Sequence, residues 1–222
     1  MVITRSGTTT EALAALQDAH ALGIRTTVIV ATAHTPATEL ADDVVLLPEL
    51  DERSVVQSRF ATGTVALLRA GLGDDLSVAL AQALALLAAP VEQTLTGLLD
   101  VEQVTFVGRG WTIGLAHEAA LKLRESAQFW TESYPAMEYR HGPVSIATTG
   151  RAVWALGEVP AGLAEQVRST GALFEHRDVD PLVEMVRVHL LCLALAARAG
   201  IDPDRPRHLT RSIVLDPTGA LV

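Results

Sequence analysis

Three charged side chains lie at helical spacing near the middle of the chain: Glu118, Lys122 and Glu125, four and three residues apart. Apolar residues recur every three or four positions through residues 115–127, and no glycine or proline interrupts them, which predicts a helix with the three charges on one face. Such a set can be a solvated surface strip, whose pairs are each worth roughly 0.2–0.5 kcal/mol. It can also hold a carboxylate that transfers a proton, and the spacing alone leaves both interpretations open.

A histidine follows this helix on a restricted backbone. Pro135 and Gly142-Pro143 bracket a segment that cannot continue as helix, so we expect His141 to lie on an irregular, constrained loop. A lone histidine is most often structural. An imidazole held close to a lysine and a carboxylate, however, can exchange protons near neutral pH.

A second group of polar residues lies near the start of the chain, between a short apolar segment and a helical one. Residues 6–10 read Ser-Gly-Thr-Thr-Thr, so they combine four hydroxyls with one glycine. Free backbone N–H groups at the start of a helix attract anions, and the loop could therefore bind a phosphate. It could equally be a simple helix cap, because Thr8 and Glu11 have the spacing of a capping box.

At these residues the sequence resembles the double SIS (sugar isomerase) domain family, in the form of the isomerase half of glucosamine-6-phosphate synthase without the glutaminase half. The resemblance covers residues 4–11, 52–57, 118–143 and 206–209, and the portion from Glu125 to His141 is the most specific. It implies an α/β fold of two flavodoxin-like, three-layer α/β/α halves with parallel sheets.

The resemblance also implies roles for the loop near the start of the chain and for the partners of the protein. Ser6 and Thr9 would bind the phosphate of a sugar 6-phosphate, with Arg5 and Thr4 as secondary candidates on the same loop. No cofactor is expected. The protein would be a homodimer whose sites are shared between subunits, because in such dimers the histidine reaches the neighbouring subunit's site.

The same resemblance assigns the chemistry of an aldose–ketose isomerisation. Glu125 would shuttle the proton, His141 would open the sugar ring, and Lys122 would stabilise the enediolate, since a nearby cation favours developing negative charge. Glu52 is a second-tier candidate. For Glu118 we favour a structural pairing with Lys122.

One departure from the family pattern limits the activity that we expect. Arg211 stands where the synthase has a lysine that forms a Schiff base, and arginine cannot make that adduct. There is also no amidotransferase half, so synthesis from glutamine is excluded. We expect a phosphosugar isomerase or an isomerising deaminase acting on a hexose or hexosamine 6-phosphate. The alternatives are a non-catalytic sugar-phosphate sensor and a broken fragment that neither binds nor reacts.

Apolar runs, prolines and glycines indicate two halves, which we place at 1–95 and 96–222. Strands are expected near 1–4, 26–31, 44–47, 104–107, 152–156 and 173, and the principal helices near 11–23, 55–70, 75–89, 90–99, 161–170 and 182–199. The first half lacks the opening strand and helix of its family. Either the chain is truncated or it has lost this unit, and both cases would leave a sheet edge exposed.

Composition excludes several classes of function. A net charge of −9 argues against non-specific nucleic-acid binding, which depends on clustered lysine and arginine. No apolar segment is long enough to span a bilayer and no signal peptide is present, so we expect a cytoplasmic protein. The single cysteine, Cys192, lies in an apolar run and is expected in the core. The histidines have no metal-ligand spacing, so we expect no metal.

Overall fold

The computed structural model describes residues 1–221 as two compact units, each with its own parallel sheet. Unit 1 contains residues 1–68 and the tail from residue 207, and unit 2 contains residues 69–206. This division differs from the boundary at 95/96 that we expected from the sequence. Helices α4 (Ser77–Ala88) and α5 (Val91–Thr94) pack on α8 (Pro181–Ala199), and the tail returns to unit 1.

Unit 1 is built on a three-stranded parallel sheet in the order β1-β2-β3. Its strands are β1 (Val2–Thr4), β2 (Thr27–Val30) and β3 (Asp43–Leu46). Its helices are α1 (Thr10–Ala21), α2 (Pro36–Leu40) and α3 (Arg59–Gly71), with a 3₁₀ turn, η1 (Pro48–Leu50). Leu16 of α1 and Ala37 of α2 pack on one face of the sheet, and Phe60 of α3 packs on the other. These are the three layers expected for this half.

The central strand follows the sequence pattern closely. Residues 28–30 of β2 are branched and apolar and all three are buried, because α1 and α2 cover one face and α3 the other. By contrast, β1 lies at the edge of the sheet, and the side chain of Ile3 is 48% exposed. Within the described residues, the outer side of β1 is therefore an open sheet edge, as expected.

Unit 2 has a four-stranded parallel sheet in the order β5-β4-β6-β7. Its strands are β4 (Gln103–Gly108), β5 (Thr131–Pro135), β6 (Arg151–Leu156) and β7 (Leu173–Glu175). Its remaining helices are α6 (Thr112–Ala127) and α7 (Leu163–Ser169), with 3₁₀ turns η2 (Leu98–Asp100), η3 (Glu138–His141) and η4 (Pro143–Ile146).

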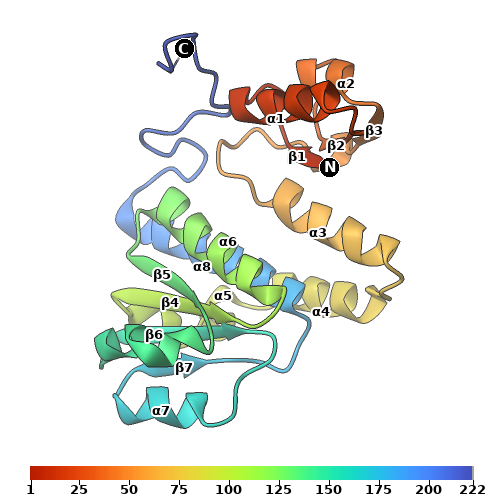
Figure 1. The fold of residues 1–222 in the computed structure, drawn as a ribbon. Helices are drawn as coiled ribbons and strands as arrows, with labels where there is room; N and C mark the ends of the chain where they lie inside the picture. The colour runs from red at the N-terminus through yellow and green to blue at the C-terminus, as the bar shows by residue number, and fades with distance from the viewer. Residues whose placement is uncertain (222) are drawn as a thin grey trace. The chain divides into compact units, whose positions relative to one another are not determined.

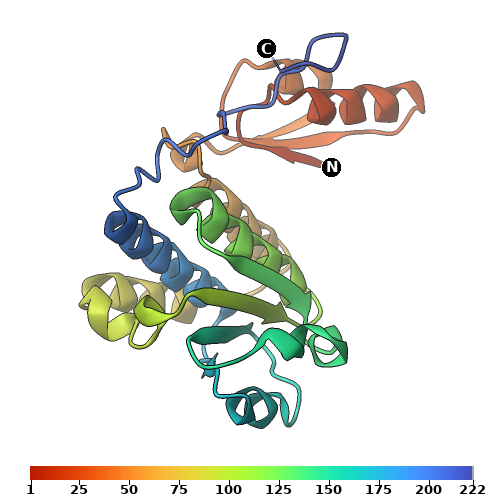
Figure 2. The ribbon, with the colours of Figure 1, turned by 90° about the vertical axis from the view of Figure 1, so that its left-hand side faces the viewer.

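Helices cover both faces of this second sheet. Within unit 2, α6 and α8 lie on one face and α7 lies on the other (Figure 1, Figure 2). Phe106 and Trp154 fill the core beneath α6 and α8, and Val107 and Val153 pack toward α7. The fold is therefore α/β with parallel sheets, as the sequence predicts.

Several boundaries differ from the prediction. No strand was predicted over 131–135, where the structure has β5. The expected helix over 90–99 ends at Thr94, and Gly97 beyond it takes a left-handed φ of +79°. Helix α3 begins at Arg59 instead of Val55. Among residues 1–221, no helix has the length and apolarity needed to cross a membrane.

Candidate active site

Lys122 lies at the centre of the charged face of α6. Its side chain is only 5% exposed, although it carries an ammonium. The Nζ atom donates a hydrogen bond to Glu125 Oε2 at 2.7 Å and lies 3.5 Å from Glu118 Oε1. Both carboxylates reach solvent in part, with side chains 21% and 25% exposed. The solvated-strip interpretation is therefore wrong for Lys122, which is a buried cation between two half-exposed acids.

The environment of this set affects the protonation of Glu118. Burial raises the pKa of Glu118 above its usual value, and the Glu125 carboxylate raises it further, whereas attraction to Lys122 lowers it. The Lys122 ammonium is nevertheless within 3.5 Å of both carboxylates, so it could stabilise negative charge that develops when one of them removes a proton from a substrate. The arrangement suits a carboxylate base with an adjacent cation.

The core beneath α6 contains Cys192 of α8, and it is buried as predicted, with 5% exposure. Burial raises the pKa of the Cys192 thiol to about 12, although Ser126 and Lys122 oppose the shift. The thiol is therefore protonated at neutral pH and is unsuited to act as a nucleophile.

His141 ends the η3 turn that follows β5, and it is exposed. The turn is fixed by Tyr139, whose ring is fully buried and whose pKa is raised to about 12 mainly by that burial. Within residues 1–221, no hydrogen bond or ion pair joins His141 to Lys122 or its carboxylates. The His141 imidazole therefore lies on a turn of unit 2 that is anchored by buried Tyr139, and it does not pair with Lys122, Glu118 or Glu125 within the described residues.

In unit 1, the predicted phosphate loop gathers its hydroxyls around a serine from the tail. The Thr8 hydroxyl donates to Ser212 Oγ at 2.8 Å, and the Oγ atoms of Ser6 and Thr9 each lie 3.3 Å from it. Gly7 makes the tight turn at φ +68°, where a Cβ atom would lie 2.1 Å from Thr35 Oγ1. No local pattern could have singled out Ser212, which is more than 200 residues away along the chain.

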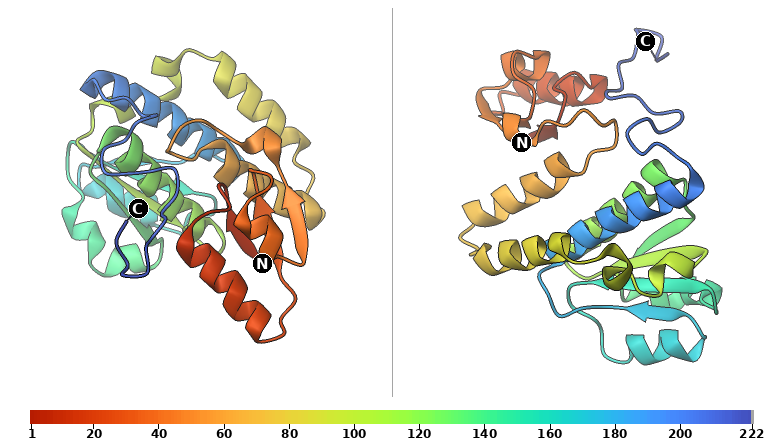
Figure 3. Two further views of the ribbon diagram at one scale, coloured as in Figure 1. Left: turned by 90° about the horizontal axis from the view of Figure 1, so that it is seen from above. Right: turned by 180° about the vertical axis from the view of Figure 1, so that it is seen from behind.

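The tail crosses the loop and the start of α1 (Figure 3). The Thr10 backbone N–H donates to the Ile213 carbonyl at 3.0 Å, and the Leu215 N–H donates to Thr10 Oγ1 at 2.9 Å. Arg211 pairs with Asp51 at 2.5 Å. Arg211 is thus held by an ion pair within unit 1.

The secondary candidate Arg5 is turned toward the backbone. Its side chain donates to the Ser54 carbonyl at 2.7 Å and to the Val55 and Arg211 carbonyls at 3.3 Å, and the residue is 2% exposed. Thr4 accepts a hydrogen bond from the Gly7 N–H at 3.3 Å. Both residues therefore help to shape the loop.

A cavity of about 300 Å³ adjoins this loop within unit 1. Thr4, Arg5, Ser6 and Thr9 all line it, as does Arg211. Among the described residues that line it, the two arginines are the charged ones, so the cavity is suited to an anion. Sequence reasoning did not single out two further polar lining residues, Gln57 and Thr64.

Glu52 has a different role in the structure. Its buried carboxylate accepts from the Ser58 N–H at 3.0 Å, the Ser58 hydroxyl at 2.9 Å and the Phe60 N–H at 3.2 Å. It therefore caps the first turn of α3, and it does not line the cavity. No group of three or more His, Cys, Asp or Glu side chains in residues 1–221 could hold a metal ion.

Comparison of the sequence with known proteins identifies its relatives. No protein-family profile matches the chain. Glutamine–fructose-6-phosphate aminotransferase (isomerizing) of Symbiobacterium thermophilum is 26% identical over 97% of this chain and 44% of that protein. The enzyme of the same name from Pseudomonas aeruginosa matches to the same extent. The chain spans less than half the length of the curated relatives it matches.

Comparison with solved structures shows the same fold. Glucosamine-6-phosphate deaminase from Thermotoga maritima superposes with a TM-score of 0.84 and 23% identity, over 96% of this chain and 74% of that one. Together with the sequence relatives, this likeness confirms the resemblance to the isomerase half of the synthase.

Proposed function

We propose that this chain, which is similar to the isomerase region of glutamine–fructose-6-phosphate aminotransferases, isomerises a hexose 6-phosphate or deaminates and isomerises a hexosamine 6-phosphate. The observation that carries the proposal is the buried Lys122 ammonium, which donates to the half-exposed Glu125 carboxylate at 2.7 Å. A purely structural ion pair gains little from burying a cation, because desolvation offsets the attraction. A base with a fixed cation beside it is what proton transfer next to a carbonyl requires.

In the proposed reaction, Glu125 removes the proton from one carbon of the open-chain sugar and returns it to the neighbouring carbon. The electron pair left by the proton forms a carbon–carbon double bond and displaces the carbonyl pair onto oxygen, which gives an enediolate whose negative charge Lys122 stabilises. The hydroxyl proton of the first carbon passes to this oxygen, so the carbonyl re-forms on the first carbon. In a hexosamine the first carbon carries the amino group, so the same step gives an imine, which water hydrolyses to the ketose and ammonia. His141 would assist the opening of the ring by moving a proton between the ring oxygen and the anomeric hydroxyl. Glu118 would hold Lys122 in place.

We assign the phosphate group to the loop in unit 1. Ser6 and Thr9 supply hydroxyl donors, and the guanidinium groups of Arg5 and Arg211 contribute positive charge to the same cavity. Arg211 cannot form an imine with a ketose, so the proposed route proceeds without a covalent adduct between the protein and the sugar.

A second candidate function is a sugar-phosphate sensor that does not turn over its ligand. One observation favours it. The Ser212 hydroxyl already forms hydrogen bonds with the hydroxyls of Ser6, Thr8 and Thr9. A tail that leaves the loop when phosphate binds would report the ligand by its movement. A sensor, however, has no need of a buried lysine beside Glu125.

The deciding experiment compares the wild type with Glu125→Gln in an assay that follows ketose and ammonia together. The substrates are the 6-phosphates of glucose, fructose, glucosamine and galactosamine. We expect turnover of at least one of them by the wild type, and a loss of roughly 10²–10⁴-fold in Glu125→Gln, because a general base typically contributes about 10²–10⁴-fold. Glu132→Gln is the matched control, since Glu132 also lies in unit 2 and accepts a hydrogen bond from the Tyr134 hydroxyl at 2.9 Å.

Binding measurements separate the two candidate functions. Saturable binding of a sugar phosphate without product in the wild type would establish the sensor and reject the isomerase. Unchanged turnover in Glu125→Gln would remove Glu125 from the mechanism. If the wild type showed no binding and no turnover of any of the four sugar phosphates, both candidate functions would be contradicted.

A further inference from the structure

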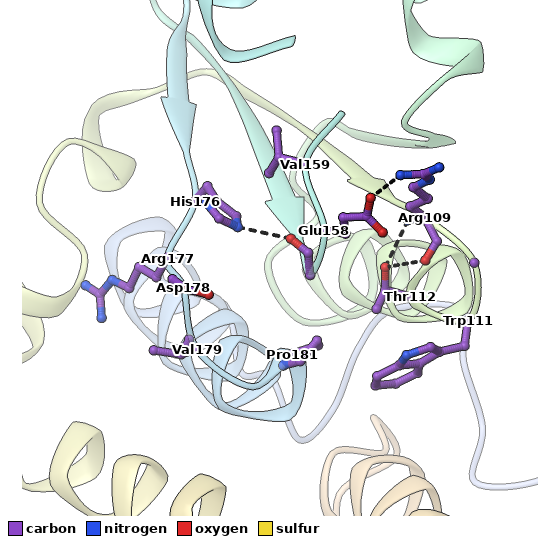
Figure 4. A pocket seen from close by; sticks show the side chains of 12 residues that line it. Arg109, Trp111, Thr112, Glu158, Val159, His176, Arg177, Asp178, Val179 and Pro181 are labelled. Carbon is purple, nitrogen blue, oxygen red and sulfur yellow. Dashed lines mark hydrogen bonds and ion pairs between the residues drawn. The ribbon is translucent and has the colours of Figure 1, made fainter. Parts of the chain in front are cut away.

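Unit 2 contains a second, larger cavity of about 870 Å³, which the proposed isomerase chemistry does not use. It lies where β4, β6 and β7 end, between the loops that follow these strands (Figure 4). In the sheet order β5-β4-β6-β7, the strand that follows β4 in the chain, β5, lies on one side of β4, and the next strand, β6, lies on its other side. The direction of winding therefore reverses at β4. A crevice at such a reversal of strand order is the usual ligand position in an open parallel sheet.

The floor of this cavity is rigid. Thr112 donates to the Leu156 carbonyl at 2.7 Å and accepts from the Arg109 N–H at 2.9 Å, so it ties the two loops together. Gly108 and Gly157 approach Thr112 so closely that an added Cβ would lie 2.2 Å and 2.9 Å from its atoms. A pocket of this size with a fixed floor is a preformed site for a small molecule.

The charges around the cavity differ from those of the unit 1 cavity. Arg109 is paired with Glu158, and Figure 4 shows the Arg177 side chain pointing out of the cavity, where it donates to the Thr94 carbonyl at 3.1 Å. None of the ion pairs formed within residues 1–221 includes Asp178. The lining therefore has no excess of positive charge to hold a phosphate, and it leaves a carboxylate for a cation.

The remaining side chains suit a ligand with many hydroxyl groups. His176 uses Nε2 in a 3.0 Å contact with the Gly157 carbonyl, which leaves Nδ1 available as a hydrogen-bond acceptor. Glu158 and Asp178 add acceptors, and Arg109 adds donors. The half-exposed indole of Trp111 lies at the rim and offers an apolar surface for the C–H face of a ring.

We propose that this cavity is a second carbohydrate site, which binds an unphosphorylated amino sugar with its ammonium against Asp178 and its ring against Trp111. The site is separate from the Lys122 set, because Thr112 and Lys122 are ten residues apart on α6, about 15 Å along the helix axis. Occupation by a free hexosamine would give the protein a response to a ligand that the proposed phosphate loop does not recognise. The inference does not depend on turnover by Glu125.

The test measures binding of D-glucosamine and D-glucose to the purified full chain by calorimetry and saturation-transfer NMR. We expect saturable binding with dissociation constants in the millimolar range. The affinity for glucosamine should exceed that for glucose roughly two- to five-fold, which is the contribution of one exposed ion pair. Asp178→Asn should abolish that preference, and Trp111→Ala should weaken both sugars at least about five-fold.

Trp130→Ala is the matched control. Both tryptophans are half-exposed in unit 2 with an arginine over the ring, at 5.1 Å for Trp111 and 4.6 Å for Trp130, but only Trp111 lines the cavity. Binding that persists in Trp111→Ala and Asp178→Asn, or no saturable binding to the wild type, would overturn the proposal. Loss of glucosamine binding in Ser6→Ala would also overturn it, by moving the sugar to unit 1.

Discussion

At the scale of the residue, the main finding is the burial of Lys122. Sequence spacing predicts the three charges on one helix face, and the structure confirms this. Spacing cannot show how deeply the face is covered, because that depends on Cys192 and other residues of α8, which lie far along the chain. Burying an ammonium costs several kcal/mol, which the hydrogen-bonded carboxylate of Glu125 must offset.

Glu118 gives this argument a pH-dependent test. Its pKa is raised mainly by burial, so the folded chain holds the proton more tightly than the unfolded chain does. The stabilisation from this group is complete below the unfolded pKa, near 4.3, and is lost as pH rises through the raised folded value. Glu118→Gln stays neutral, so its melting temperature should equal or exceed that of the wild type at pH 7–8.

Thermal melts between pH 4 and pH 8 would measure this effect. The advantage of Glu118→Gln over the wild type should shrink toward pH 4, where the wild-type carboxyl also becomes neutral. Glu49→Gln, at an exposed position of η1, should follow the wild type throughout. If Glu118→Gln were less stable at pH 8, attraction to Lys122 would outweigh burial, contrary to the direction of the pKa.

At the scale of the element, prediction succeeded where burial is nearly complete and failed where it is partial. The apolar runs of β2 and α8 predicted these elements to within one or two residues. The segment Thr131–Pro135 has no apolar alternation, because β5 is an edge strand whose side chains are mostly half-buried. The start of α3 was misplaced because it is fixed by the Glu52 carboxylate, which lies outside the apolar pattern.

This cap on α3 can be tested by substitution. Glu52→Ala leaves the N–H groups of Ser58 and Phe60 without their acceptor, in a place where Phe60 is buried. We expect the free energy of unfolding, measured by urea denaturation, to fall by about 2 kcal/mol. Glu49→Ala, three residues away and exposed, should change it by less than about 0.5 kcal/mol. Equal effects of the two substitutions would show that the cap contributes nothing specific.

At the scale of the whole molecule, the sequence could not locate the tail. The tail was assigned to the second half on chain order, yet Arg211 pairs with Asp51 and Ser212 meets the loop at Thr8. These contacts join residues about 160 and 200 positions apart, and no local pattern encodes them. As a result, the group of hydroxyls at residues 6–10 was predicted without the serine at its centre, and its binding of a phosphate stays a prediction.

The exposed surface of unit 2 supports the proposed homodimer. Helix α4 packs on α8 through Ala79 and Leu86, while Leu80, Leu84 and Leu87 are each 58–61% exposed. These three leucines are four and three residues apart and so form one apolar stripe. An exposed apolar stripe of this kind is typical of an interaction surface, and the homodimer, with this stripe as its interface, stays a prediction.

If the sites are shared between subunits, two inactive variants should complement each other. In a mixed dimer of Glu125→Gln and His141→Ala, isolated with two different tags, one site receives both substitutions and the other receives neither. We expect about half of the wild-type turnover, one active site in two, although each variant alone is inactive. The mixed dimer of Glu125→Gln and Lys122→Ala is the control and should stay inactive, because both residues come from the same α6 helix. An inactive Glu125→Gln and His141→Ala dimer would mean that each subunit completes its own site.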